Sequence, residues 1–285
     1  MKDKKTYRLR TYKSVFLLMP FLILYSLIFP NKLILVDEIR LSLESFFLPI
    51  ICYKTIGKEY TDRENNPIEG PTDIKFQEID FYRKTLEPGD LLFTSNRRYL
   101  GTTFISGKWK HASVYLGTKE KLISTFGVSS PVYNCLKVYF KTGKEELIID
   151  SDLNGVHARE FSSLFFYRDI SYLQSITAFR LNIPTQRSVH FLENVFQQIN
   201  KNYDFDLLTY NSKSIYCSEL LFDALSAINI NLEVPSKIAN RKVVMPTDIV
   251  QFFTKKIAST NQFSFLFFLE KKDYRIVTRP INDVL

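Results

Sequence analysis

Strand-like runs dominate the chain after Thr85, and two helical patterns follow them. The runs cover residues 90–94, 111–116, 147–150 and 175–181. Apolar residues then recur at helical spacing in residues 188–200 and 217–228. A last apolar run, residues 263–269, is typical of a buried strand, although its phenylalanines would also suit an apolar substrate. The order of these elements predicts an α+β domain with an antiparallel sheet.

The N-terminus carries a membrane-targeting pattern. Residues 1–14 contain six basic residues and one acid, and the uncharged run 15–29 follows directly. This run has the length of a signal-peptide core, but no small-residue cleavage site follows it, so an uncleaved anchor extended to Val36 is an equal alternative. Basic residues ahead of the run predict a membrane-anchored or exported protein with its domain on the non-cytoplasmic side. The alternative is a buried N-terminal helix of a soluble protein.

Three regions follow from this reading. Residues 1–36 form a basic leader with an anchor or signal, and residues 37–84 form an amphipathic segment and a polar linker. Residues 85–285 form the folded domain. The amphipathic part, residues 37–51, is expected to lie on the membrane or to pack on the domain.

The net charge of +8 does not indicate nucleic-acid binding. The first fourteen residues hold +5 of it, which leaves +3 for the other 271 residues. No basic stripe with interleaved aromatic residues is present, so we expect no nucleic-acid partner.

The chain has three cysteines, Cys52, Cys135 and Cys217, which allow at most one disulfide and leave an odd thiol. Three histidines are equally scattered, without the paired spacing of metal ligands. We therefore expect no metal and no other cofactor, and we examine the thiols as reactive groups.

Cys217 stands in the first turn of the second predicted helix, with Ser214 as the expected N-cap. The free N–H groups and the helix dipole at this end stabilise a thiolate. Cys217 also continues the apolar stripe of its helix, so a purely structural role is the alternative.

A thiolate nucleophile needs a base, and His111 opens a predicted strand that would hold its ring rigidly. His157 follows a glycine turn and competes for the role, whereas His190 lies on the polar side of a helix. Asp150, at the end of a neighbouring strand, would orient the imidazole, with Asp152 as its rival.

Six motifs in order resemble one known family. They are EPGDLLF (87–93), KHASVYLG (110–117), IIDSDLNGV (148–156), NYDFD (202–206), YCSELL (216–221) and MPTDI (245–249). This series resembles the circularly permuted papain-like hydrolases, the YiiX/YebB-like branch of the NlpC superfamily, over residues 86 to about 252.

The resemblance implies a papain-like fold, in which a small antiparallel sheet packs against helices, and a Cys-His-polar triad, with Cys217 and His111 at the positions of the catalytic pair. It also implies that Tyr216 lines the site and that the Cys217 N–H binds an oxyanion. Two departures stand out. The family usually has Glu at the position of Asp150, and residues 118–146 are longer than expected. The third residue thus stays open among Asp150, Asp152 and His157.

Residues and resemblance together predict a membrane-anchored thiol hydrolase, of the amidase or peptidase type, that cleaves an amide or ester through an acyl-enzyme on Cys217. The substrate would be a lipid or a cell-envelope compound. One alternative is a lipid acyltransferase or acyl hydrolase of the same fold. Another is a catalytically inactive, membrane-tethered binding module, in which Cys217 and His111 would lie too far apart to interact.

Overall fold

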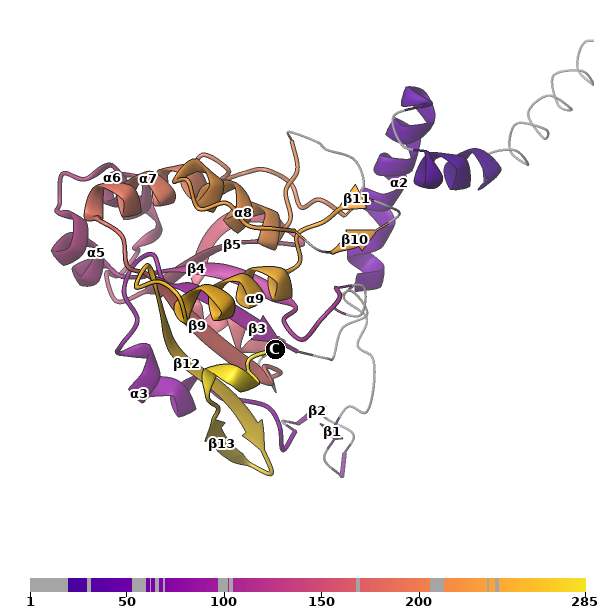
Figure 1. The fold of residues 1–285 in the computed structure, drawn as a ribbon. Helices are drawn as coiled ribbons and strands as arrows, with labels where there is room; N and C mark the ends of the chain where they lie inside the picture. The colour runs from indigo at the N-terminus through magenta and orange to yellow at the C-terminus, as the bar shows by residue number, and fades with distance from the viewer. Residues whose placement is uncertain are drawn as a thin grey trace, which may run out of the picture.

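The structure is a computed structural model that describes residues 20–29, 32–52, 60–61, 63–64, 67–68, 70–96, 102, 105–167, 170–205, 213–234, 236–238 and 241–285. Its centre is a seven-stranded sheet in the order β13-β12-β9-β3-β4-β5-β6, in which every pair is antiparallel (Figure 1). The strands are β3 (Leu91–Ser95), β4 (His111–Thr118), β5 (Glu146–Asp152), β6 (Gly155–Glu160), β9 (Ser175–Leu181), β12 (Phe263–Lys272) and β13 (Arg275–Thr278). The predicted α+β class with an antiparallel sheet is confirmed.

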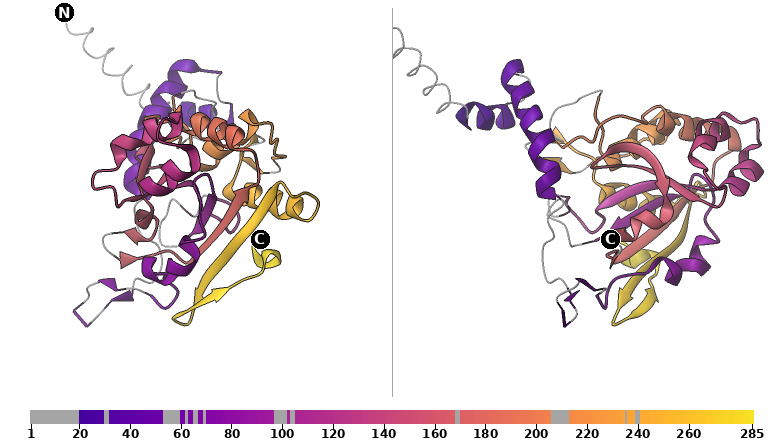
Figure 2. Two further views of the ribbon diagram at one scale, coloured as in Figure 1. Left: turned by 90° about the vertical axis from the view of Figure 1, so that its left-hand side faces the viewer. Right: turned by 180° about the vertical axis from the view of Figure 1, so that it is seen from behind.

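Five helices cover one face of this sheet (Figures 1 and 2). They are α5 (Lys119–Phe126), α6 (Pro131–Leu136), α7 (Thr185–Phe196), α8 (Cys217–Ala227) and α9 (Pro246–Ile257). The alternation of β4 turns Ala112, Val114 and Leu116 toward them, and all three are fully buried. Helices α5 and α6 account for the extra length of residues 118–146.

The other face is covered by shorter segments, among them η1 (Phe76–Ile79), α3 (Asp80–Arg83) and η3 (Phe161–Leu164). Ile74 and Ile79 are fully buried there, and the Ile74 N–H donates to the Leu173 carbonyl at 2.6 Å. The end of segment 37–84, which the sequence suggests is a linker, is thus part of this core.

β12 is a core strand along most of its length. Phe267, Phe268 and Leu269 are buried, and β12 pairs with β9 from Phe263 to Glu270. The phenylalanines therefore fill the two layers of the core, which argues against a substrate-binding role for this strand. The remaining elements are short: β1 (Tyr60–Thr61), β2 (Pro67–Ile68), η2 (Lys137–Tyr139), β7 (Phe166–Tyr167), β8 (Ile170–Ser171), β10 (Lys237–Ile238), β11 (Arg241–Lys242) and η4 (Ile281–Asp283).

Two N-terminal helices project from the sheet domain in Figure 1 and in the right-hand view of Figure 2. The first covers residues 20–28 and the second, α2, is Ile34–Cys52, which includes the predicted amphipathic segment. The first half of the leader lies outside the described residues. Within the described part of the chain, no helix is both long enough and apolar enough to cross a membrane, so the predicted membrane segment is not supported.

Candidate active site

Cys217 is the first residue of α8 and is almost completely buried. Two serines fix the chain on either side of it. Ser151 of β5 donates to the Ile215 carbonyl at 2.6 Å, and Ser218 donates to the Val244 carbonyl at 2.8 Å. The helix start is thereby tied both to the sheet and to the loop that precedes α9.

The expected N-cap is wrong. The N-cap of α8 is Tyr216, whose side chain does not cap the helix, whereas Ser214 forms an isolated bridge with Asn202. The Ile215 N–H donates to the Asn202 carbonyl at 2.9 Å, so the segment before α8 is extended beside residue 202 and the helix begins two residues later than Ser214 would allow.

His111 is held at the start of β4 by the loop before it. Trp109 is fully buried; its backbone N–H donates to the Thr247 hydroxyl at 3.1 Å and its indole N–H to the Val284 carbonyl at 2.8 Å. Gly107 has φ +80°, and a Cβ there would overlap the Thr247 side chain. The loop therefore packs directly on the first turn of α9, and Thr247 of the MPTDI motif fixes the strand that carries His111.

The His111 ring connects the thiol to a buried carboxylate. Its Nε2 lies 2.7 Å from Asp150 Oδ2, and the ring also interacts with Cys217. With Nε2 engaged, Nδ1 is the nitrogen left for the sulfur. Burial lowers the pKa of His111, but its interactions with Cys217 and then with Asp150 outweigh burial and raise the pKa to about 10. The arrangement therefore favours an imidazolium between Cys217 and Asp150.

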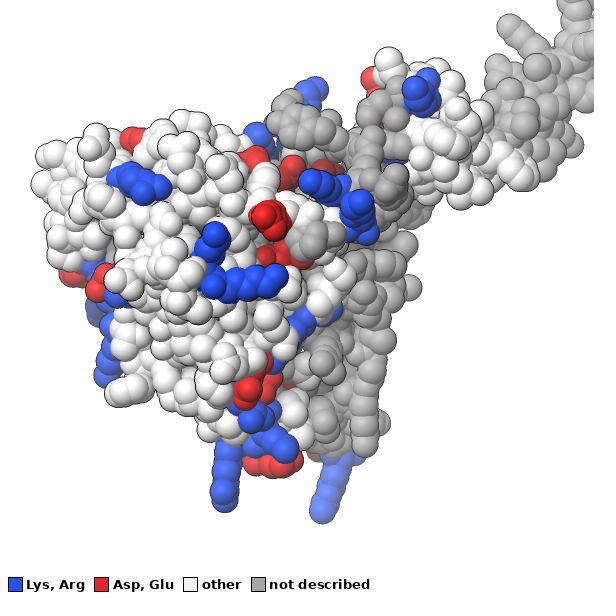
Figure 3. All heavy atoms as spheres, viewed as in Figure 1, with Lys and Arg blue, Asp and Glu red and all other residues white. Residues whose placement is uncertain are grey.

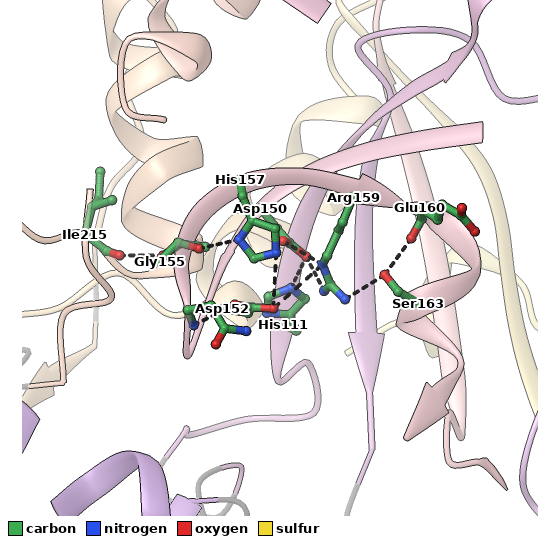
Figure 4. Close-up of polar contacts among 11 residues, drawn as sticks. His111, Asp150, Asp152, Gly155, His157, Arg159, Glu160, Ser163 and Ile215 are labelled. Atoms are coloured by element: carbon green, nitrogen blue, oxygen red, sulfur yellow. Dashed lines mark hydrogen bonds and ion pairs between the residues drawn. The ribbon is translucent and has the colours of Figure 1, made fainter. Parts of the chain in front are cut away.

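Arg159 of β6 holds the other side of the same carboxylate (Figure 4). Its Nε and Nη2 donate to Asp150 Oδ1 and Oδ2 at 3.0 and 2.6 Å, and its Nη1 donates to Ser163 Oγ at 2.7 Å. Burial would raise the pKa of Asp150, but Arg159 and then His111 hold it well below its usual range. Asp150 is therefore an anion fixed by two cationic neighbours.

Sequence reasoning missed Arg159, although a signal was present. Val156 and Ala158 of β6 face the helix-covered side. Strict alternation then puts His157 and Arg159 on the opposite face, beside Asp150 on the neighbouring strand. The signal was the spacing of Arg159, which follows the candidate His157 by two residues and lies across a turn from the candidate Asp150.

His157 and Asp152, the alternatives to His111 and Asp150, lie close to each other. His157 Nδ1 lies 3.0 Å from the Gly155 carbonyl oxygen, and its Nε2 lies 3.6 Å from Asp152 Oδ2. His111 contacts Asp150 instead. His190 is exposed on α7, with Glu193 3.9 Å away. The structure thus brings together Cys217, His111 and Asp150 and leaves His190 apart.

Asp150, Asp152 and His157 each offer a ligand atom within 4.8 Å of the others, the spacing of a metal site. Arg159 already supplies a positive charge there, because it binds Asp150 and lies 3.8 Å from Asp152. The two carboxylates are therefore engaged with a guanidinium, which occupies the place of a cation, and the arrangement of these side chains does not fit a metal ion.

Tyr216 precedes the thiol but packs away from the triad. Its ring contacts Val243 and Met245, and its hydroxyl accepts a hydrogen bond from the Val244 N–H at 3.2 Å. Burial and then the charge of Glu219 raise the pKa of Tyr216, so its hydroxyl stays protonated. A role for Tyr216 in lining the site stays a prediction.

Glu219 is a second feature that the sequence analysis missed. It occupies the third position of α8, in the first turn of the helix. Its Oε2 is buried without a partner among the described residues. Burial, followed by the charges of Asp223 and Asp204, raises the pKa of Glu219 to about 7. A titrating carboxyl thus lies two residues from the thiol.

Together these groups have the chemistry for acyl transfer. A thiol at a helix N-terminus is paired with an imidazole, and a buried carboxylate fixes that imidazole. Since α8 begins at Cys217, the N–H of that residue has no acceptor within the helix and is free to face an oxyanion.

Comparison with known proteins identifies a family for this chain. The model of a family described as permuted papain-like amidase enzyme, YaeF/YiiX, C92 family, matches residues 85–267. No curated protein matches the chain. Among solved structures, the metalloprotein yiiX from Escherichia coli O157:H7 is similar, with a TM-score of 0.37 and 10% identity over 63% of this chain and 95% of that chain. The family match covers well over half of the sequence, and this chain therefore belongs to the permuted papain-like amidase family, YaeF/YiiX, C92.

Proposed function

We propose that this chain is a cysteine hydrolase that cleaves an amide or ester bond through an acyl-enzyme on Cys217. The observation that carries the proposal is the position of His111, which is hydrogen-bonded to Asp150 and lies near enough to Cys217 for the two side chains to interact. Amidase chemistry is also what the family description names.

The proposed reaction has two stages, formation of an acyl-enzyme and its hydrolysis. The Cys217 thiolate attacks the substrate carbonyl carbon, and the N–H at the start of α8 stabilises the oxyanion that forms. His111 gives its proton to the leaving amine or alcohol as the carbon–heteroatom bond breaks, which leaves a thioester. A water then loses a proton to His111 and attacks the thioester, and the acid product leaves as the thiolate and imidazolium are restored. Asp150 keeps the ring in place throughout.

The substrate class and the location belong to this proposal. The basic and apolar leader supports attachment of the domain to a membrane surface. A substrate at that surface is an amide- or ester-containing lipid or cell-envelope compound.

The test is a burst experiment with p-nitrophenyl acetate. Cys135 is an exposed free thiol, so the reference protein carries Cys135→Ala and Cys52→Ala. In this background Cys217 should give a burst of nitrophenolate and a single acetyl adduct in the intact mass. Adding Cys217→Ala should remove both, and His111→Ala should remove the burst. Equal acetylation with and without Cys217 would refute the proposal.

Acyl transfer between lipids is the second candidate function. It is favoured by the exposed apolar surface of the N-terminal helices, which would place the site near a bilayer. Incubation with a phospholipid and an added alcohol acceptor distinguishes the two: free fatty acid indicates hydrolysis, and an acylated acceptor indicates transfer. The inactive module predicts neither product, and the interaction of His111 with Cys217 argues against the separation that it expects.

A further inference from the structure

The exposed apolar surface of the described residues is concentrated on the two N-terminal helices. Of eighteen large hydrophobic side chains that are exposed, twelve lie between residues 21 and 50. Phe21, Ile34, Leu35 and Phe46 are each more than 60% exposed. In Figure 3 the same helices, at the upper right, are mostly white. Soluble domains rarely keep so large an apolar surface without a partner.

The chain bends inside this region. Ser26 donates to the Asp37 carboxylate, and Arg40 Nε donates to Ser26 Oγ at 2.9 Å. In one straight helix residues 26 and 40 would be about 21 Å apart, at about 1.5 Å per residue. The two helices are therefore not one continuous helix but pack on each other and cross (Figure 1), and we call residues 20–52 the N-terminal hairpin.

Three polar groups of the hairpin lie buried between its helices. Ser26, Asp37 and Arg40 are at most 5% exposed, and Arg40 also binds Glu44 at 3.0 and 3.1 Å. These groups satisfy one another, so the only exposed charges of the described hairpin are Lys32 and Glu38, and insertion has to keep these two at the level of the head groups. A straight span would separate Ser26 from Asp37 and Arg40, and would leave the charged pair without its hydroxyl partner.

Basic charge adjoins the hairpin in the sequence. Residues 1–14 carry +5, and Lys32 stands in the turn between the helices. Apolar side chains next to a cluster of basic residues are the pattern of segments that bind anionic bilayers from one side.

We propose that the N-terminal hairpin inserts its apolar side chains into one leaflet of an anionic bilayer, without crossing it. Residues 1–14 and the papain-like domain then lie on the same side of the membrane. This refines the membrane attachment proposed above and replaces the single anchor by a one-sided contact. The active site is thereby held close to the lipid surface from which a substrate would come.

Binding is tested with the full chain and two kinds of vesicle, phosphatidylcholine alone and phosphatidylcholine with phosphatidylglycerol. The wild type should float with the anionic vesicles and bind them more weakly as salt rises. Phe46→Asp with Phe47→Asp should weaken binding by about tenfold or more, because two apolar side chains lose their place in the acyl region. Phe81→Asp is the matched control, since Phe81 is 75% exposed but lies on the domain, and it should bind as the wild type does.

Sidedness is tested in sealed membrane vesicles from cells that express the chain. Lys5→Cys is introduced with Cys52→Ala, and an impermeant maleimide is added. The new thiol and the exposed Cys135 should react to the same extent in vesicles of either orientation. Protection of one thiol until detergent is added would show a crossing segment and overturn the proposal.

Two further outcomes separate this inference from the proposed chemistry. Cys217→Ala should bind vesicles as well as the wild type, so a failed burst experiment leaves the membrane result intact. A stable dimer in light scattering, combined with no flotation on either vesicle, would assign the apolar surface to a second copy of the chain and overturn the proposal.

Discussion

Asp150 Oδ2 lies 2.7 Å from His111 Nε2, and the same oxygen accepts a hydrogen bond of 2.6 Å from Arg159. One buried carboxylate thus fixes the imidazole while a guanidinium compensates its charge. The net charge of Cys217, His111, Asp150 and Arg159 is zero when thiolate and imidazolium form, which allows this ion pair to exist in a largely buried place.

Asp150→Asn should lower the turnover of the p-nitrophenyl ester by about a hundredfold or more, because an amide cannot stabilise the imidazolium. The pKa of His111 is raised to about 10, and the variant loses part of that rise. The loss of activity at alkaline pH should therefore begin at lower pH, as a pH–rate profile will measure. Asp152→Asn is the control, since Asp152 pairs with His157, and it should keep the wild-type profile.

Arg159→Gln should shift acid unfolding to higher pH. The pKa of Asp150 is depressed, so its stabilisation is present above about pH 4, the ordinary range of an aspartate, and is lost as pH falls through the folded-state value. Removing the guanidinium raises that value. Breaking such a pair costs about 3–5 kcal/mol of unfolding free energy, which circular dichroism during acid and urea titration will detect. Arg275→Gln, on the exposed face of β13, should leave the midpoint unchanged.

Glu219→Gln should change how stability depends on pH. The pKa of Glu219 is raised from 4.5 to about 7, so the folded protein binds a proton that the unfolded chain releases between these values. Wild-type stability should therefore fall as pH rises from about 4.5 to 7 relative to the variant. Melting temperatures at pH 5 and pH 8 measure the difference. Glu120→Gln, also in a first helical turn but exposed, should show the same pH dependence as the wild type.

Gly155→Ala should be more destabilising than Gly127→Ala. Both glycines have positive φ, +91° and +88°, so each substitution costs about 1–3 kcal/mol of backbone strain. A Cβ at Gly155 would also lie 2.2 Å from the Lys201 carbonyl oxygen, whereas one at Gly127 meets nothing within 4 Å. Urea unfolding should separate the two variants by at least about 1 kcal/mol. Equal losses of unfolding free energy would mean that the backbone near Gly155 moves away from the added Cβ at no cost in stability, and would contradict the prediction.

The sequence predicts those elements whose pattern is local. The run 175–181 became β9 with the same bounds, and the stripe from Cys217 became α8. α9 was not predicted, since its apolar stripe follows a motif that was considered only as a family signature. Ser214 was misassigned because its bridge to Asn202 is a contact between segments that helical spacing does not report.

The residues of the candidate site also fall into those that the sequence predicts and those that it does not. His111 and Asp150 are predictable because each stands at one end of a strand-like run, and their pairing follows once β4 and β5 are neighbours. The pKa rise of Glu219 depends on burial and on acids from another segment, including Asp204. The spacing of residues in the sequence does not report burial or such distant charges. The raised pKa of Glu219 could therefore be found only in the folded structure.

The chain order of the site has a consequence for biosynthesis. His111, Asp150 and Arg159 lie on three consecutive strands of one meander, β4-β5-β6, whereas Cys217 arrives about sixty residues later on α8. During synthesis from the N-terminus, the carboxylate, imidazole and guanidinium are made before the thiol leaves the ribosome. Cys217 therefore joins the three side chains of the β4-β5-β6 meander last. The nascent chain has no complete catalytic site until α8 has docked on the sheet.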